Sequence, residues 1–187
     1  MANKHYLQRA SPIRFVVLFI TLFLIFNYAN KFFFSITTPG KYYSAFLAHN
    51  LNYIDWLRWV LLHTSAAVLN WMGFTTIVSK YELLVAGHNI LRLVYTCLGL
   101  GVMSFIAAFV IAYPKPVKSK LIYFFTAIFC LQVLNIVRLV LLALYWDNRK
   151  NRVIDHHLIF DVIIYIIIAI SIYYWVNKNA KETHATN

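Results

Sequence analysis

An arginine inside a membrane-length apolar run is the feature that most constrains how this chain folds. The segment Leu121 to Trp146 reads LIYFFTAIFCLQVLNIVRLVLLALYW and is long enough to cross a bilayer as a helix. Gln132, Asn135 and Arg138 recur at every third position, so they share one stripe of that helix. A guanidinium in lipid is costly and normally faces the protein interior or water, which predicts a polar site. The alternative is an arginine that snorkels to the near interface, about 12 Å of helix away.

The composition indicates an integral membrane protein. Of the 187 residues, 61% are hydrophobic and 12% are charged, about half the charged share of a soluble domain. The net charge of +11 lies in short basic clusters beside apolar runs, which favours phospholipid headgroups over nucleic acid as a partner. Cys97 and Cys130 are too few for a disulfide framework. We therefore expect the bilayer as a partner and no nucleic acid.

Hydropathy and charge together predict how the chain crosses the bilayer. The mostly apolar segments of about 19 or more residues are 13–34, 94–113, 121–146 and 158–176. If the basic N-terminus, the lysine-rich loop 114–120 and the basic tail all lie in the cytoplasm, the chain crosses four times. Residues 43–72 are rich in tryptophan and polar groups, so they form either a fifth span or an interfacial helix.

These patterns predict one all-α membrane domain over residues 1–187, a multipass transmembrane helical bundle of four or five spans. Residues 1–34 are expected to form a retained signal-anchor helix, and residues 94–176 the catalytic helices. Residues 35–93 are expected to form an interfacial or extracytoplasmic segment. Within it, short apolar runs flank the turn signal Gly87-His88-Asn89, which predicts a small β-hairpin outside the membrane.

Three reactive groups fall at the same membrane face of this bundle. Cys97 lies near the start of its helix, Arg138 late in the next, and His156 and His157 just before the last. A helix N-terminus and a nearby arginine both favour a thiolate, which predicts a lowered pKa for Cys97. Histidine can carry a proton near neutral pH, and arginine can stabilise an oxyanion. A thiol, a base and an oxyanion donor are the groups that acyl transfer requires.

Each reactive group also has a simpler interpretation. A lone cysteine in a membrane helix often serves as a small apolar filler, and paired histidines beside a helix start are often interfacial. His156, His157 and Asp161 could instead serve a metal-dependent hydrolase. We expect no metal and no cofactor, because two adjacent histidines on a helix do not easily chelate one ion. Asp161 lies one turn after His157 and could orient its ring, which favours His157 over His156 as the base.

The same residues resemble a known family, the exosortase/archaeosortase membrane transpeptidases. Cys97-Leu98-Gly99 is similar to the Cys-Ser-Gly motif of that family, although Leu98 replaces the serine. Asn135-Ile136-Val137-Arg138 is similar to its Asn-x-x-Arg motif, and His156-His157 opens the last helix where exosortases have a histidine. The resemblance covers roughly residues 75–176. Size and the double histidine look most like the short Bacteroidetes subfamily, exosortase F.

The resemblance implies a cysteine transpeptidase or protease of the bacterial cytoplasmic (inner) membrane, with its active site facing the outside. It would cleave a C-terminal sorting signal, made of a short motif, a transmembrane helix and a basic tail, from exported proteins. Cys97 would form a thioester that an acceptor resolves, Arg138 would support the thiolate or oxyanion, and His157 or His156 would carry the proton. The residues expected to support them are Asn135, Gln132, Asp161 and Gly99.

Two further expectations concern partners and the competing function. The chain is shorter than typical family members with about eight helices, so a small accessory membrane protein is an expected partner. The competing function is a non-enzymatic membrane assembly or secretion factor, in which Arg138 binds lipid phosphate or a partner helix. That function predicts tolerance of Cys97→Ala and intolerance of Arg138→Ala.

Overall fold

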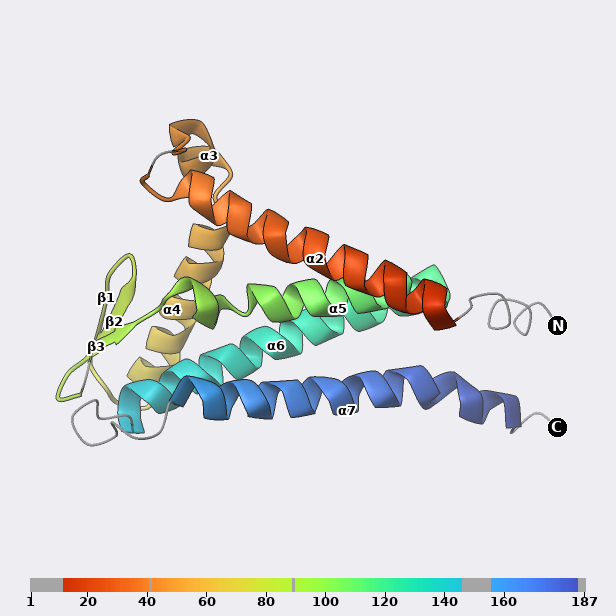
Figure 1. Cartoon of the computed structure of the whole chain (residues 1–187). Helices are drawn as coiled ribbons and strands as arrows, with labels where there is room; N and C mark the ends of the chain where they lie inside the picture. Colours follow the sequence, from red (N-terminus) through yellow and green to blue (C-terminus); the bar gives the residue numbers. More distant parts are fainter. Residues whose placement is uncertain (1–11, 41, 89, 146–155, 185–187) are drawn as a thin grey trace.

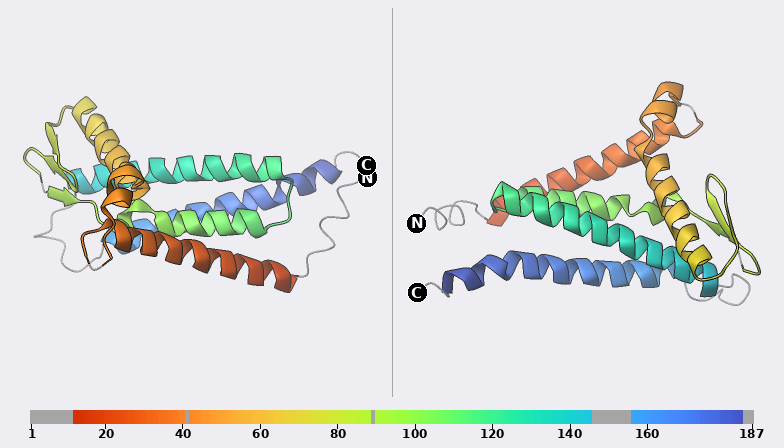
Figure 2. Two further views of the ribbon diagram at one scale, coloured as in Figure 1. Left: turned by 90° about the horizontal axis from the view of Figure 1, so that it is seen from above. Right: turned by 180° about the vertical axis from the view of Figure 1, so that it is seen from behind.

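The computed structural model describes residues 12–40, 42–88, 90–145 and 156–184, with side chains in the last helix for residues 160–177 only. The long described helices form an elongated bundle with both chain termini at one end (Figure 1, Figure 2). They are α2 (Pro12–Thr37), α5 (Leu100–Ala112), α6 (Val117–Tyr145) and α7 (His156–His184). α5 packs against α2 and α6, and α7 packs against α6. We call the end opposite the termini the sheet end.

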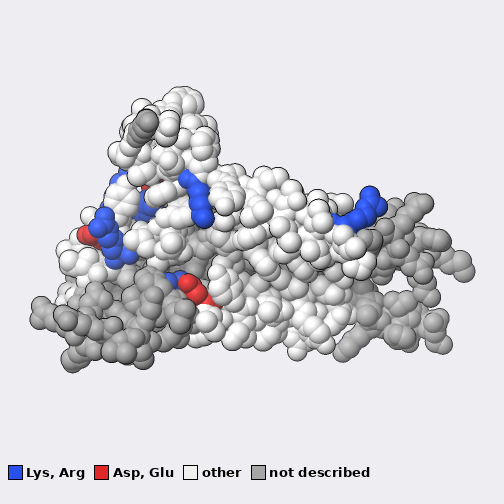
Figure 3. Space-filling view, in the orientation of Figure 1, with Lys and Arg blue, Asp and Glu red and all other residues white. Residues whose placement is uncertain are grey.

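Three of the described helical segments are long and apolar enough to cross a membrane: Pro12–Thr37, Val117–Tyr145 and Phe160–Asn177. The prediction of a mostly helical membrane protein is therefore confirmed. On the face seen in Figure 3, lysines and arginines gather towards the two ends and leave an uncharged band between them. Such a band is what a lipid-facing surface requires.

The predicted span 94–113 is wrong in its first third. Its α-helical part is only α5, whose 13 residues cover about 20 Å, less than the bilayer core. The 3-10 turn η1 (Tyr95–Leu98) precedes it, and Gly99 separates the two with φ +73°. A residue in the left-handed region cannot continue an α-helix, so Gly99 breaks the element between Cys97 and α5.

Residues 43–72 form two helices at the sheet end, α3 (Ala45–Asn50) and α4 (Tyr53–Trp71). The Asn52 side chain caps α4 by accepting a hydrogen bond from the Asp55 N–H at 3.1 Å. α4 packs across α6 and is not among the described helices that are apolar enough to cross a membrane. Its outer face exposes Trp56, Trp59 and Trp71, the side chains typical of an interfacial helix.

The predicted hairpin is part of a three-stranded antiparallel sheet among the described residues. The strands are β1 (Thr76–Val78), β2 (Glu82–Val85) and β3 (Ile90–Arg92), in the order β1-β2-β3. Leu83 opposes Leu91 in the β2–β3 register, and Leu83 is fully buried in a core shared with α4 and α6. Leu93 then donates its N–H to the Tyr81 carbonyl at 2.8 Å. The sheet thus fixes the chain a few residues before Cys97.

Polar contacts tie α7 to its neighbours at both ends of the bundle. Near the termini, Trp175 Nε1 donates to Ser119 Oγ at 3.2 Å, and Lys115 donates to the Trp175 carbonyl. Towards the sheet end, Arg138 of α6 pairs with Asp161 of α7. Lys4 and Arg9 of the N-terminal basic cluster, and residues 146–155, lie outside the described residues, so the topology predictions that rest on them stay predictions.

Candidate active site

Cys97 is buried in η1 and held by its own turn. Its N–H donates to the Val94 carbonyl at 3.0 Å, and the residue is 5% exposed. The next side chain, Leu98, is fully buried in the core formed with α4, the sheet and α6. An apolar residue at this position therefore anchors the turn by burial, worth about 1.5–3 kcal/mol for such a side chain.

Arg138 lies against the Cys97 thiol inside the protein. Its Nη2 is 3.8 Å from Cys97 Sγ, and its Nη1 donates to Asp161 Oδ1 at 3.1 Å. The residue is 4% exposed, so its guanidinium faces other elements of the bundle instead of reaching along α6 to the interface. Side chains from η1, α6 and α7 thus meet at one point, a thiol on one side of the cation and a carboxylate on the other.

The polar stripe of α6 continues behind this contact. Asn135 is 2% exposed, and its Nδ2 donates to Gln132 Oε1 at 3.2 Å. Gln132 Nε2 in turn approaches Met103 Sδ of α5 at 3.8 Å. Asn135 also packs on Gly99, where an added Cβ would lie 3.0 Å from Asn135 Nδ2. Gly99 is thus required both by its positive φ and by the space that Asn135 fills.

We expect Gly99→Ala to lower the free energy of unfolding by about 1–2 kcal/mol from backbone strain alone. The added methyl also presses on Asn135, so thiol alkylation at Cys97 should change as well. Thermal unfolding of the protein in detergent measures the first effect. Gly101→Ala is the matched control, because Gly101 lies within α5 and has nothing within 4 Å of an added Cβ. Equal stability of the two variants would contradict the role given to Gly99.

The expected lowering of the Cys97 pKa is wrong for this arrangement of the described groups. Cys97 precedes α5 and lies outside the three candidate spans. Burial raises the pKa of its thiol, and the Arg138 guanidinium, which favours the thiolate, offsets this only in part. The sequence indicates the nearby cation but not the depth of burial. A thiol with a raised pKa is protonated at neutral pH and requires a base to become a nucleophile.

The rate of Cys97 alkylation should therefore keep rising with pH above 8, because the thiolate fraction grows until the pH passes the raised pKa. Replacing Arg138 with glutamine removes the cation that lowers the pKa, so the rate at pH 8 should fall. A small water-soluble alkylating reagent, used on a Cys130→Ser background, reports the Cys97 thiol specifically. A rate that is already flat from pH 6 to pH 8 would indicate a preformed thiolate and contradict this assignment.

His156 and His157 are the first residues of α7, and their side chains lie outside the described part of the structure. The choice between them as the base stays a prediction. The Asp161 carboxylate, expected to orient His157, accepts a hydrogen bond from Arg138. Among the residues whose side chains are described, no group of three His, Cys, Asp or Glu side chains could hold a metal ion.

The contact between Arg138 and Asp161 was not predicted from the sequence. The sequence does contain an indication of this ion pair. Asp161 is the single acidic residue in segment 158–176, and Arg138 is the single basic residue in segment 121–146. Opposite charges in adjacent membrane helices commonly pair. Nothing in the sequence indicates the contact from Gln132 to Met103, because a methionine in an apolar segment is common.

Comparison with known proteins places this sequence in a family. A protein-family model described as transmembrane exosortase matches residues 2–174. No curated protein and no solved structure matches the chain. The matched range contains η1, the whole of α6 and the described part of α7 that carries Asp161.

Proposed function

This chain belongs to the transmembrane exosortase family, and from that premise we propose that it is a cysteine transpeptidase. It cleaves the C-terminal sorting signal of exported proteins through a thioester and transfers them to an acceptor. The observation that supports this most is the buried contact between Cys97 Sγ and Arg138 Nη2 at 3.8 Å. A thiol beside a fixed cation, in an otherwise apolar bundle, is suited to nucleophilic attack on a peptide carbonyl.

The first half-reaction begins with proton removal. Because burial raises the pKa of the Cys97 thiol, a base must take the proton, and His157 or His156 is the candidate. The thiolate then attacks the carbonyl carbon of the scissile peptide and forms a tetrahedral oxyanion. As this intermediate collapses, the C–N bond breaks, and the imidazolium gives its proton to the leaving amine. The sorting signal departs, and the remaining protein is held as a thioester.

In the second half-reaction an acceptor nucleophile attacks the thioester carbonyl. The same histidine takes the proton of the acceptor, the C–S bond breaks, and the imidazolium returns its proton to the Cys97 sulfur, which restores the thiol. With an amine acceptor the product is an amide, and with water it is a free carboxylate. No redox partner is needed in either half-reaction.

Arg138 has two roles in this scheme, and Asp161 has one. The guanidinium stabilises the thiolate and the oxyanion, since its charge is constant and its donors are fixed. The Asp161 carboxylate, half exposed, accepts from Nη1 and so fixes the direction in which Nη2 points. Asp161 is thus a positioning residue. Asn135 and Gln132 support the site through their contacts with each other, with Gly99 and with Met103.

The arrangement of the bundle supports an active site that faces outward from a bacterial cytoplasmic membrane. Both termini lie at one end, together with the lysine-rich connection between α5 and α6 (Figure 1). The basic residues there include Arg14, Lys115 and Lys118. We assign this end to the cytoplasm by the positive-inside rule, although the sheet end also carries basic residues, among them Arg58, Lys80 and Arg92. With that assignment the sheet end with Cys97 faces the periplasm or exterior.

The competing function, a membrane assembly factor using Arg138, is disfavoured by the contacts that this residue makes within the bundle. A guanidinium that binds lipid phosphate or a partner helix needs donors directed at that ligand. Arg138 instead contacts a thiol and a carboxylate within the same chain. In an assembly factor Cys97 would serve only as a small apolar filler, and its contact with a guanidinium would have no role.

The proposal is tested by co-expression with candidate substrates. These are exported proteins of the same genome that end in a transmembrane helix and a basic tail. Loss of the C-terminal segment is followed by intact mass in cells carrying either the wild type or the Cys97→Ala variant. A shorter product that requires Cys97 supports the proposal, and identical processing in both strains removes it. A chelator in the medium should have no effect, unlike the result expected of a metal-dependent hydrolase.

A further inference from the structure

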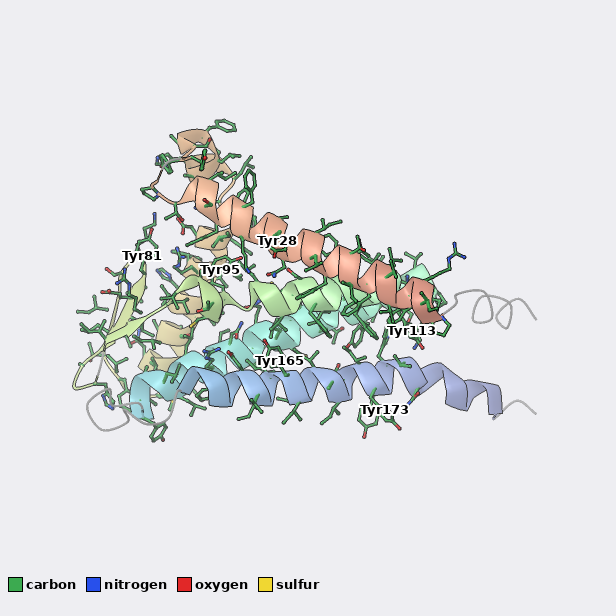
Figure 4. The ribbon with its side chains drawn as sticks, viewed as in Figure 1. Tyr28, Tyr81, Tyr95, Tyr113, Tyr165 and Tyr173 are labelled. Carbon is green, nitrogen blue, oxygen red and sulfur yellow. The ribbon has the colours of Figure 1, made fainter. Side chains whose placement is uncertain are left out.

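A cavity of about 420 Å³ opens beside the active site at the sheet end. Its volume is within the range of ligand sites. The polar side chains that matter for its chemistry are Arg58, Arg92, Tyr81, Tyr95, Thr96 and Asp55. Tyr81 and Tyr95 lie at this end of the bundle, far from Tyr113 at the other (Figure 4). Thr96 is the residue before Cys97, so the cavity wall includes the immediate neighbour of the nucleophile in the sequence.

The cavity is positively charged. Asp55 is shared by two cations, since it accepts from Arg58 and lies 3.2 Å from Lys80. The cavity wall itself carries two cations, Arg58 and Arg92, and Asp55 is its one acidic side chain, whereas Lys80 approaches Asp55 from outside the wall. Among the described residues Arg92 forms no ion pair. The excess of positive charge favours an anionic ligand.

Arg58 is the buried centre of this group. Its side chain is 5% exposed, and its guanidinium stacks 4.6 Å from the centre of the Tyr81 ring. Arg58 Nε is buried and makes no hydrogen bond within the described residues. A buried donor without an acceptor is costly, and an anion that accepts from a guanidinium removes that cost.

The position of the cavity favours a phosphate-bearing headgroup. Thr37, the last residue of the apolar span Pro12–Thr37, lines it, so it lies where that span leaves the bilayer. Phe34 and Ile54 supply apolar wall next to the cations. A phospholipid has a phosphate for the arginines and, beyond its glycerol ester, acyl chains for such a wall. The volume also exceeds what one acidic side chain needs.

We propose that this cavity binds the phosphate group of a membrane phospholipid, next to Cys97. Phosphate binding is inferred from the cavity alone, whereas any role of the bound lipid at the Cys97 thioester rests on the proposed function. Arg58 and Arg92 hold the phosphate oxygens, and Phe34 contacts an acyl chain. Soluble phosphate esters share this chemistry, and the experiment separates the two sources.

The test measures thermal unfolding of the full chain in a neutral detergent, on the Cys97→Ala background so that binding is read without turnover. Dioleoyl phosphatidylglycerol should raise the unfolding temperature, and dioleoylglycerol, which has the same tails and no phosphate, should not. Glycerol phosphate is titrated separately. If it stabilises the protein too, the phosphate suffices and soluble esters are accepted. If only the lipid stabilises, the lipid is the ligand.

Arg92→Gln should weaken the apparent affinity for phosphatidylglycerol by about tenfold, through loss of one charge-assisted hydrogen bond. Arg92 is exposed and unpaired among the described residues, so this variant should fold even if Arg58→Gln does not. Lys118→Gln, with the same change of charge at the other end, is the matched control and should leave affinity unchanged. Equal effects of Arg92→Gln and Lys118→Gln would overturn the proposal. So would stabilisation by both lipids alike, or by N-acetylglutamate amide but not by phosphatidylglycerol.

Discussion

Replacing Cys97 with alanine is expected to abolish processing of a co-expressed substrate, a loss of at least about a thousandfold in rate. Cys97 supplies the atom that becomes covalently bound, and no neighbouring group in the proposed mechanism can take that role. The substitution removes one sulfur from a buried turn, so its cost in stability should be modest, about 1 kcal/mol. The measurement is the amount of shortened substrate by intact mass, normalised to the amount of folded membrane protein.

Cys130→Ala is the matched control for this variant. Cys130 is exposed on α6 and takes no part in the site, so its replacement should leave processing intact. A Cys97→Ala protein that still processes the substrate would remove the cysteine mechanism. Loss of processing in both variants would point instead to a general effect on folding or membrane insertion.

Replacing Arg138 with glutamine is expected to slow processing by roughly a hundredfold to a thousandfold. The variant removes the charge that supports the thiolate and oxyanion, and it leaves Asp161 without its cation. Arg138→Lys should be only slightly better, because an ammonium cannot hold Asp161 and face the thiol with two fixed donors. Processing rates are compared with the rate of Cys97 alkylation at pH 8, which reports the thiol independently of substrate.

The double variant Arg138→Gln, Asp161→Asn separates catalysis from folding. It removes both partners of the ion pair, so it should restore the stability lost in Arg138→Gln while processing stays low. Asp161→Asn alone should cost about tenfold in processing, since it loosens the guanidinium without removing its charge. Recovery of processing in the double variant would show that Arg138 serves only to neutralise Asp161.

The sequence predicts the helical bundle and the main contact of the site for physical reasons. Apolar runs of membrane length leave few options besides helices, because lipid cannot satisfy backbone groups. The three-residue spacing of Gln132, Asn135 and Arg138 places them on one stripe, and the structure turns that stripe inward. Cys97 meets Arg138 because the end of one helix and the start of its neighbour lie at the same face.

Other features depend on tertiary packing and have weaker signals. Hydropathy extends through Gly99, so it does not reveal that a left-handed residue separates η1 from α5. The raised pKa of Cys97 follows from burial beneath α4 and the sheet, which are distant in sequence. The cavity around Arg58 likewise joins α2, α4 and the segment after β3. These features depend on contacts between elements that are distant in the sequence, so the local pattern does not reveal them.

The most direct test of the central claim is the mass of the wild-type protein isolated during turnover of a co-expressed substrate. The proposed mechanism predicts a fraction of the chain that carries the substrate minus its sorting signal, attached at Cys97. Neutral hydroxylamine should release this adduct, since it cleaves thioesters and leaves amides intact. Slow acceptor supply should increase the fraction. A substrate that is processed while Cys97 remains unmodified, or an adduct that resists hydroxylamine, would contradict the thioester.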